Sequence, residues 1–337
     1  MNNSTKVSDI GDFRQTIKQN NRRTFFVMFA FVFIYVCLGI LIDLLLYFDP
    51  TIGDGGLYQN ATYFFNNILY NAPPVATLVL AGIAIISIMI AFIFNNKLMM
   101  MGTTSKEISQ TSDKLAADER QLLNIVEELK ISAGMNYMPK VYIIEENYAN
   151  AFASGYSQKS ALIAVTRRLM NMLNRHELQA VVAHELTHIR NNDIKLTLFA
   201  TVLANIMIIV LDVALRGVIY NRKAPPALKI GVLVLRFVIP VLTYFLMMYL
   251  SRKREYMADA GAVELMRDNK PMITALKKIS GDYETNKDEI EIPNSDDMRR
   301  AAYIFNIDSV KGFKNFLSGL FSTHPKTDDR IKELSGA

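Results

Sequence analysis

The chain has 337 residues, of which 51% are apolar, and it carries a formal net charge of +5. This apolar content, with a positive mean hydropathy, is unusual for a soluble protein and indicates that part of the chain lies in lipid. The modest charge, without a basic stretch interleaved with aromatic residues, excludes nucleic acid from the expected partners, and the single cysteine, Cys37, cannot form an internal disulfide.

Apolar residues collect in four stretches, at 24–48, 74–94, 196–215 and 230–250. Each has about twenty residues or more, and a helix of that length, at about 1.5 Å per residue, crosses a hydrocarbon core of about 30 Å. The first stretch contains Asp43 as its one charged residue and the second contains none. Both are therefore predicted to span a membrane.

The third and fourth stretches contain residues that are costly against lipid. Asp212 lies near the end of the third, and Arg236 and Pro240 lie in the fourth. Such residues are tolerated where they face protein or reach the headgroups. We expect both stretches to span, because their length exceeds what a core helix of a soluble protein needs. A buried hairpin is the alternative.

Basic residues predict the orientation of the first two stretches. Five of them precede the first stretch: Lys6, Arg14, Lys18, Arg22 and Arg23, whereas residues 49–73 contain no Lys or Arg. Basic residues favour the cytoplasmic side, so the N-terminus is predicted to be cytoplasmic. We expect a tail and transmembrane hairpin over 1–95 and a second domain over 96–337, which the hydrophobic hairpin 196–250 interrupts. The loop inside that hairpin is also basic, which conflicts with an outward position.

The second domain begins with the patterns of a globular α+β fold. Four apolar residues recur at helical spacing and predict an amphipathic helix: Leu122, Ile125, Val126 and Leu129. Residues 140–144 and 161–165 are rich in Val and Ile and predict strands of a small sheet. A second helix is predicted from Asn174, because Glu177 three residues later can complete a capping box.

The remaining elements follow the fourth hydrophobic stretch. A helix is predicted over 252–269, the charged segment 282–300 is expected to be an exposed insertion or a mobile loop, and a short helix is predicted after residue 327. The expected fold class is therefore an α+β membrane protein that is mostly helical, with about four hydrophobic helices and a small β-sheet.

Two histidines four residues apart carry the strongest chemical signal. His184 and His188 share one face of the predicted helix and can present two imidazole nitrogens to one metal ion. Glu185 lies beside them, about 100° around the helix. This is the H-E-x-x-H arrangement of zinc peptidases, in which the glutamate handles the proton of the attacking water. The alternative is a pair of core histidines that hydrogen-bond within the protein.

A catalytic zinc takes three protein ligands, so a third ligand is expected. His176 is excluded, because it lies eight residues before His184, about 12 Å along the helix axis. Glu255 and Asp259 are again four residues apart on a predicted helix. One carboxylate can bind the metal and the other can accept the N–H of a ligating histidine. The alternative is an ordinary charged helix surface.

The two motifs together resemble a known family. H-E-L-T-H at 184–188 followed by E-Y-M-A-D at 255–259 resembles the HtpX family of bacterial membrane metalloproteases in peptidase family M48, relatives of the type I CAAX prenyl proteases. N-A-F-A at 150–153, and H-P at 324–325 followed by Arg330, resemble two further elements of that family. The likeness extends from the N-terminal hairpin to the last ten residues.

The resemblance implies a role for each matching residue. It implies His184, His188 and Glu255 as ligands of one zinc ion per subunit, in a gluzincin-like protease domain. Glu185 would be the general base and acid, and Asp259 the partner of a ligating histidine. An edge strand would pair with an extended substrate, and this strand would consist of Asn150, Ala151, Phe152 and Ala153. His324 and Arg330 would steady the oxyanion or bind the peptide carbonyl.

The resemblance also implies a function and a location. The expected protein is a multi-pass protease of the bacterial plasma membrane whose catalytic domain faces the cytoplasm. It would cut damaged or misfolded membrane proteins, as part of quality control and the stress response. Two alternatives stay open: a processing protease of the CAAX type, and a non-enzymatic membrane protein with structural zinc. The second is disfavoured, because structural zinc typically has four ligands that include cysteine, and Cys37 lies in a hydrophobic stretch.

Overall fold

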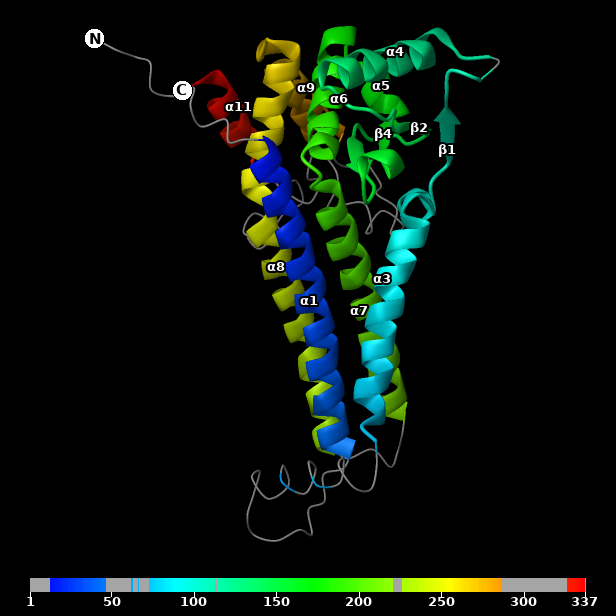
Figure 1. Cartoon of the computed structure of the whole chain (residues 1–337), viewed down its shortest axis with the longest axis vertical. Helices are drawn as coiled ribbons and strands as arrows, with labels where there is room; N and C mark the ends of the chain where they lie inside the picture. Colours follow the sequence, from blue (N-terminus) through cyan, green and yellow to red (C-terminus); the bar gives the residue numbers. More distant parts are fainter. Residues whose placement is uncertain are drawn as a thin grey trace, which may run out of the picture. The chain divides into compact units, whose positions relative to one another are not determined.

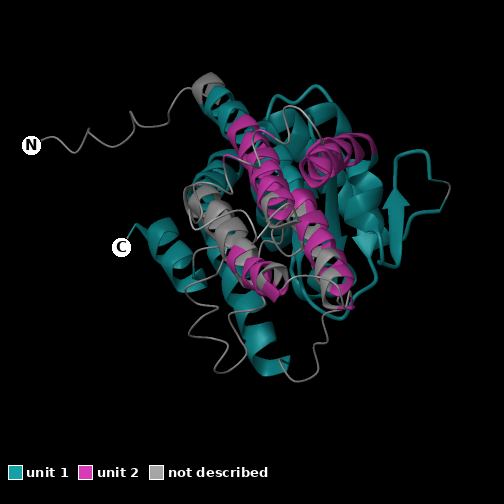
Figure 2. Ribbon diagram, turned by 90° about the horizontal axis from the view of Figure 1, so that it is seen from below, with its two compact units in different colours: residues 1–24, 94–201, 245–337 teal, residues 25–93, 202–244 magenta. Residues whose placement is uncertain are grey.

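The computed structural model describes residues 13–46, 62, 66, 73–112, 114–220, 226–286 and 326–336. The chain divides into two compact units, coloured separately in Figure 2. Unit 1 comprises Met1–Thr24, Phe94–Thr201 and Phe245–Ala337, and unit 2 comprises Phe25–Ile93 and Val202–Tyr244. Unit 2 thus collects residues from all four hydrophobic stretches, while every described candidate site residue belongs to unit 1.

Apart from Pro74, the described residues of the four hydrophobic stretches lie in helices. These are α1 (Phe13–Leu46), α3 (Val75–Met100), α7 (Ile194–Tyr220) and α8 (Pro226–Met266) (Figure 1). Within the described residues, Thr16–Asp43 and Val75–Met100 have the length and composition to cross a membrane. The crossing of a membrane by α7 and α8 stays a prediction. The apolar side chains of Phe25, Phe29 and Phe33 are more than half exposed, as expected for a surface that faces lipid.

Within unit 2, Asp43 joins the first hydrophobic helix to the second. Its carboxylate accepts hydrogen bonds from the backbone N–H of Ala76 and of Thr77, each at 2.9 Å, and from Oγ1 of Thr77 at 2.8 Å. The free N–H groups at the start of a helix need such acceptors and favour a negative charge. Gly39 lies one turn earlier, where an added Cβ would meet the backbone of Thr77. The one acid of the first stretch therefore caps α3 at a point of close helix contact.

The charged residues of the third and fourth stretches pair with each other in unit 2. Nη2 of Arg236 in α8 lies 3.1 Å from Oδ1 of Asp212 in α7. A charge inside a hydrophobic segment is costly, and pairing reduces that cost. The ion pair thus accounts for the two charged residues of these stretches, Asp212 and Arg236.

Unit 1 contains a four-stranded mixed sheet. Its strands are β1 (Ser105–Ile108), β2 (Lys140–Ile144), β3 (Ala151–Ser154) and β4 (Leu162–Thr166), in the order β1-β2-β4-β3. β2 and β4 pair in parallel, and the outer strands pair with them antiparallel. The predicted strands are confirmed, and β3 is an edge strand as expected. β1 was not predicted, because three of its four side chains are exposed and show no alternation.

Further helices of unit 1 are α4 (Ala117–Ser132), α5 (Arg167–Met172), α6 (Arg175–Arg190), α9 (Lys270–Asn286) and α11 (Thr327–Ser335), with a short 3₁₀ helix at Gln158–Ser160. α5 and α6 contact the sheet, α4 and α9 contact α6, and α11 contacts α9. The four apolar residues expected to face the core from α4 are buried. The capping box at the start of α6 is confirmed: Asn174 Oδ1 accepts from the N–H of Glu177, and the Glu177 carboxylate accepts from the N–H of Asn174.

The charged segment 282–300 is not entirely an exposed insertion. Its first residues form the last turn of α9, and Oδ2 of Asp282 accepts a hydrogen bond from Nε of Arg168 at 2.8 Å. The Asp282 side chain is 12% exposed. That part of the expectation was wrong, because the ion pair compensates for burial of the carboxylate. Residues 287–300 lie outside the described part of the chain.

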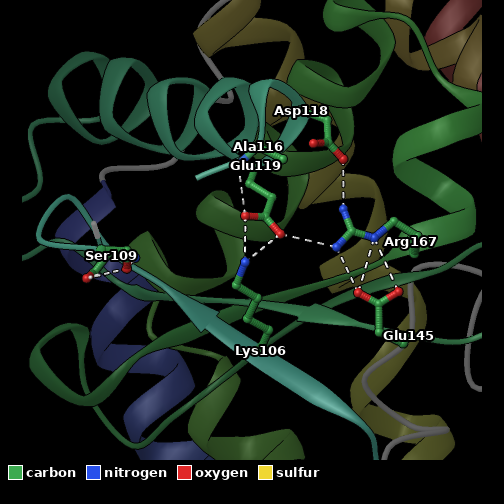
Figure 3. A network of polar contacts seen from close by, with 8 residues as sticks. Lys106, Ser109, Ala116, Asp118, Glu119, Glu145 and Arg167 are labelled. Carbon is green, nitrogen blue, oxygen red and sulfur yellow. Dashed lines mark hydrogen bonds and ion pairs between the residues drawn. The ribbon is translucent and has the colours of Figure 1, made fainter. Parts of the chain in front are cut away.

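A network of ion pairs holds the sheet to α4 (Figure 3). Arg167, the first residue of α5, contacts Asp118 at 2.7 Å, Glu119 at 3.3 Å and Glu145 at 2.8 Å. Glu119 is buried and also accepts a hydrogen bond from Nζ of Lys106 in β1 at 2.7 Å. Its pKa is lowered, chiefly by the hydrogen bond from Lys106. These contacts fix the side of the sheet formed by β1 and β2, whereas the site described below lies beside β3.

Candidate active site

Two histidines of α6, His184 and His188, converge on one point. Their Nε2 atoms lie 3.2 Å apart, and the rings meet edge to face with centroids 4.8 Å apart. This geometry follows from their spacing of four residues, which places both side chains on one face of the helix. His184 is fully buried and the His188 side chain is 13% exposed. The pair therefore lies inside unit 1, with access through His188.

α8 brings a carboxylate to the same point. The two carboxylate oxygens of Glu255 lie 3.6 Å from Nε2 of His184 and 3.7 Å from Nε2 of His188. The ligand atoms of these three residues all lie within 4.8 Å of one another. Two imidazole nitrogens and one carboxylate form a donor set that suits a transition-metal ion and leaves a coordination position open. The residues fit the metal that the sequence predicts, and their role as ligands stays a prediction.

Asp259 holds the ring of His184 from behind. Its Oδ1 lies 2.9 Å from Nδ1 of His184. Arg330 in α11 holds the carboxylate in turn: its Nε donates to Oδ2 at 2.9 Å and its Nη2 donates to Oδ1 at 2.6 Å. Burial alone would raise the pKa of Asp259, but the Arg330 charge and its hydrogen bonds outweigh burial and lower it. Asp259 is therefore ionised, and its contact with Nδ1 leaves Nε2 of His184 on the side of Glu255; its role as the partner of a metal ligand stays a prediction.

Asp193 holds the ring of His188 in the same way. The sequence analysis did not predict this contact. Its two carboxylate oxygens each lie 3.1 Å from Nδ1 of His188. The chain reaches this position through Asn192, which has a φ of 57°. Asparagine adopts that left-handed conformation more readily than most residues. The succession Asn191, Asn192 and Asp193 after a helix was the signal available in the sequence, and it indicated a turn without indicating its direction.

The charges around the metal-free site favour protonated histidines. Burial favours the neutral ring of His188, but the charges of Asp193, Glu255 and Glu185 outweigh it and raise its pKa to about 9. Burial also acts against the charged ring of His184, and its hydrogen bonds to Asp259 and Glu255 raise its pKa nonetheless. A metal ion that binds the two Nε2 atoms must displace these protons.

Glu185 is a buried carboxyl group that interacts with both histidines, and its role in proton transfer stays a prediction. It is 1% exposed, and burial raises the pKa of its carboxyl group above the usual value, while the charges of both histidines act in the opposite direction. The backbone N–H of Ala153 in β3 also donates a hydrogen bond to it. A buried carboxyl group with a raised pKa can both accept and donate a proton near neutral pH.

β3 presents part of its backbone away from the sheet. The N–H of Thr166 donates to the carbonyl oxygen of Asn150 at 2.9 Å, and alternation along an antiparallel pair then directs the peptide groups of Ala151 and Ala153 away from β4. The Asn150 side chain accepts from the N–H of Ala151 at 2.9 Å and is fully buried. Phe152 is buried as well. The substrate contacts expected of these four residues stay predictions.

The late motif is described in part. His324 lies outside the described residues. Arg330 is 2% exposed, and the hydrogen bonds described above direct it to Asp259; its Nη2 also lies 3.5 Å from Nδ1 of His184. The expected role of Arg330 as a donor to the oxyanion stays a prediction, while its observed contacts place it behind His184.

Comparison with known proteins assigns the family. The crystal structure of S. mikatae Ste24p is similar over 80% of this chain and 60% of that chain, with 18% identity and a TM-score of 0.47. Residues 116–337 match Peptidase family M48. A Protease HtpX homolog from Helicobacter acinonychis (strain Sheeba) is 40% identical over 326 residues, 96% of this chain and 98% of that relative. One from Bacteroides fragilis (strain YCH46) is 32% identical over 94% of this chain and 96% of the relative. The family match and these two relatives show that the chain belongs to peptidase family M48 and is an HtpX-type protease.

Proposed function

We propose that this HtpX-type protease is a zinc endopeptidase in which His184, His188 and Glu255 bind the metal and Glu185 transfers the proton. The observation that carries the proposal is the convergence of three ligand atoms within 4.8 Å, with Glu185 one residue from the first of them. Imidazole and carboxylate together suit zinc better than the hard cations Mg²⁺ and Ca²⁺, which prefer oxygen ligands alone.

The chemistry is divided between the ion and the chain. A zinc ion in this position supplies Lewis acidity, which lowers the pKa of water and polarises a carbonyl group. Glu185 takes a proton from the attacking water and passes it to the leaving amine, as its burial and raised pKa allow. Asp259 and Asp193 keep the two imidazole rings in the tautomer whose Nε2 faces the metal.

The edge strand supports binding of an extended peptide. The carbonyl groups of Ala151 and Ala153 face away from β4, so an extended substrate can donate backbone hydrogen bonds to β3, while the N–H groups of these two residues contact Asn150 and Glu185. Such pairing recognises main chain more than side chain, which suits a protease that acts on many unfolded segments. The proposed substrate and oxyanion contacts are completed by Asn150, Phe152 and His324, whereas the hydrogen bonds of Arg330 to Asp259 favour a supporting role behind His184.

The proposed substrates are damaged or misfolded membrane proteins, cut at the cytoplasmic face of the bacterial plasma membrane. Two helices can span a bilayer, and basic residues flank the first of them on the side of the N-terminus. α7 begins at Ile194, six residues after His188, so a proposed metal ligand is close in sequence to a hydrophobic helix. This proximity in the chain supports action near the membrane surface.

The experiment starts from metal-free protein. The full chain is purified in detergent with a chelator, zinc is restored, and self-cleavage and casein digestion are followed. We expect cleavage to return with zinc in the wild type and to stay absent in His184→Ala. His176→Ala is the matched control and should cleave as the wild type does. His176 lies in the first turn of the same helix and outside the metal group, which comprises His184, His188 and Glu255. Failure of zinc to restore cleavage would instead favour a non-enzymatic role.

A further inference from the structure

The turn after α6 adopts a conformation that needs support. α6 ends at Arg190, Asn191 caps it, and Asn192 has a φ of 57°. A residue other than glycine in this region carries a conformational cost and persists where surrounding contacts hold it. The next residue, Asp193, carries the carboxylate that contacts Nδ1 of His188. Whatever holds the turn therefore also holds the orientation of the His188 ring.

The first helix of the chain holds the turn on one side. Nδ2 of Asn20 in α1 donates a hydrogen bond to the carbonyl oxygen of Asn191 at 3.0 Å. Nδ2 of Asn192 donates to Oδ1 of Asn21 at 3.0 Å. These contacts join residues 171 positions apart in the chain, and Asn20 is 3% exposed. A buried amide is costly unless it is hydrogen-bonded, so the contact from Asn20 is a fixed part of the packing.

α8 holds the turn at a second point. Nη1 of Arg254 donates to Oγ1 of Thr197 at 2.9 Å and to the carbonyl oxygen of Asp193 at 3.4 Å. Arg254 is 7% exposed and directly precedes Glu255. Asn20 thus fixes the backbone at the start of the turn and Arg254 fixes it at the end.

We propose that Asn20 is a positioning residue of the metal centre. By holding the carbonyl group of Asn191 it fixes the turn, the turn places the Asp193 carboxylate on Nδ1 of His188, and the ring presents Nε2 to the metal. This inference rests on the proposed function, in which His188 is a ligand. Carboxylates behind a ligating histidine fix its orientation and tautomer and affect metal affinity. Asn20 lies two residues before Arg22 and five before Phe25, so the polar turn that precedes the hydrophobic part of α1 becomes part of the metal site.

The test measures metal binding in the full chain. Purified protein in detergent carries Glu185→Gln so that it does not digest itself, and after chelation it is titrated with Co²⁺ against a competing chelator. Asn20→Asp keeps the shape of the side chain and removes the N–H donor. Asp193→Asn removes the carboxylate itself, and the two changes are also combined. Gln19→Ala, at the exposed neighbouring position in α1, is the control.

We expect Asn20→Asp to weaken Co²⁺ binding about fivefold, the factor that one hydrogen bond represents, and to alter the visible bands of bound Co²⁺. Asp193→Asn should weaken binding by about 10–100-fold. The double variant should bind as Asp193→Asn does, because Asn20 acts through Asp193. Gln19→Ala should match the reference protein. A role of Asn20 in stability alone would lower the unfolding temperature and leave the Co²⁺ bands unchanged.

Two results would overturn the inference. In the first, Asn20→Asp binds Co²⁺ with the same affinity and visible spectrum as Gln19→Ala. In the second, the fold-loss of Co²⁺ affinity in the double variant equals the product of the fold-losses in the two single variants. If Asn20→Asp does not fold, Asn20→Ala replaces it in the same cycle. A reference protein whose Co²⁺ binding is unaffected by His184→Ala would overturn the proposed function, and this inference with it, so the two failures are distinguishable.

Discussion

Arg330 and Asp259 form a buried ion pair behind the first histidine of the metal group. Nη2 of Arg330 lies 2.6 Å from Oδ1 of Asp259, and the same oxygen lies 2.9 Å from Nδ1 of His184. Asp259 and Arg330 are 3% and 2% exposed. One carboxylate oxygen thus joins α11, at the end of the chain, to α6. The result is a site that joins residues 146 positions apart in the chain.

Arg330→Met removes the partner of a buried charge. We expect a loss of about 3–5 kcal/mol in the free energy of unfolding, because the Asp259 carboxylate would be buried without compensation, and a weaker affinity for zinc. Denaturant unfolding and chelator competition measure the two effects. Combining Arg330→Met with Asp259→Asn should recover stability, and Lys332→Met, at an exposed position of α11, should have no effect. If Arg330→Met kept its stability and its zinc but lost cleavage, Arg330 would be a donor to the oxyanion instead.

Metal affinity should depend on pH through His188. Because its pKa in the metal-free site is raised to about 9, a bound proton must leave before the metal binds at lower pH. The apparent affinity should therefore fall as pH drops below about 9, by up to about tenfold per pH unit. Chelator competition between pH 6.5 and 9.5 measures the slope. An affinity that stays constant over this range would contradict the charge balance described for the site.

The stability of the metal-free protein should fall as pH rises, whereas its metal affinity should increase. A histidine whose pKa is raised on folding stabilises the fold fully below its unfolded pKa of about 6.5, and the stabilisation is lost as pH rises through the folded value. The metal-free protein should therefore become less stable between pH 6.5 and about 9. Thermal unfolding of Asp193→Asn is the control, because without the Asp193 charge this dependence should shrink.

Gly261 lies where α8 is in close contact with α6. Gly261 is two residues after Asp259, and an added Cβ there would meet Cγ2 and Oγ1 of Thr187, the residue before His188. Gly261→Ala should cost about 1–3 kcal/mol in the free energy of unfolding and lower zinc content, because overpacking moves the helices apart. Thr187→Ala in the same chain removes the atoms that clash and should restore both. Gly281→Ala, where an added Cβ meets nothing, is the matched control. Equal stability of Gly261→Ala and wild type would refute the close contact.

Asp43 should stabilise the hairpin formed by α1 and α3. Asp43→Ala removes the acceptor for two backbone N–H groups and the hydroxyl of Thr77. A lost helix cap costs about 1–2 kcal/mol, so the unfolding temperature in detergent should fall. The measurement uses the Glu185→Gln background, and Ile40→Ala, at a partly exposed position of the same helix, is the comparison. A fall no larger than that of Ile40→Ala would show that the cap contributes little.

Local patterns in the sequence predicted much of the fold and of the site. The histidine spacing, the capping box at Asn174 and the apolar stripe of α4 all depend on helix periodicity, so residues close in the chain determine them. The assignment of Glu255 and Asp259 used the same periodicity on a second helix. The geometry of these residues matches the expectation because α6 and α8 are both regular at these positions.

What the sequence did not predict depends on tertiary contacts. Asp193 reaches His188 because Asn192 adopts a left-handed conformation, and contacts from α1 and α8 hold the turn. The partner of Asp43 lies on another helix, so its role as a cap was not visible in the pattern of α1. Arg330 was assigned by resemblance, and its ion pair with Asp259 joins two segments with no common period.

Zinc content and cleavage measured together in Glu185→Gln separate metal binding by His184, His188 and Glu255 from proton transfer by Glu185. Glu185 is not one of the three residues whose ligand atoms converge, so the variant should retain one zinc ion per chain. Its cleavage of casein and of itself should fall by at least about 10²-fold, the contribution typical of a general base. Zinc retained at wild-type level with cleavage at the wild-type rate would contradict the role of Glu185, and loss of zinc from this variant would contradict the assignment of the three ligands.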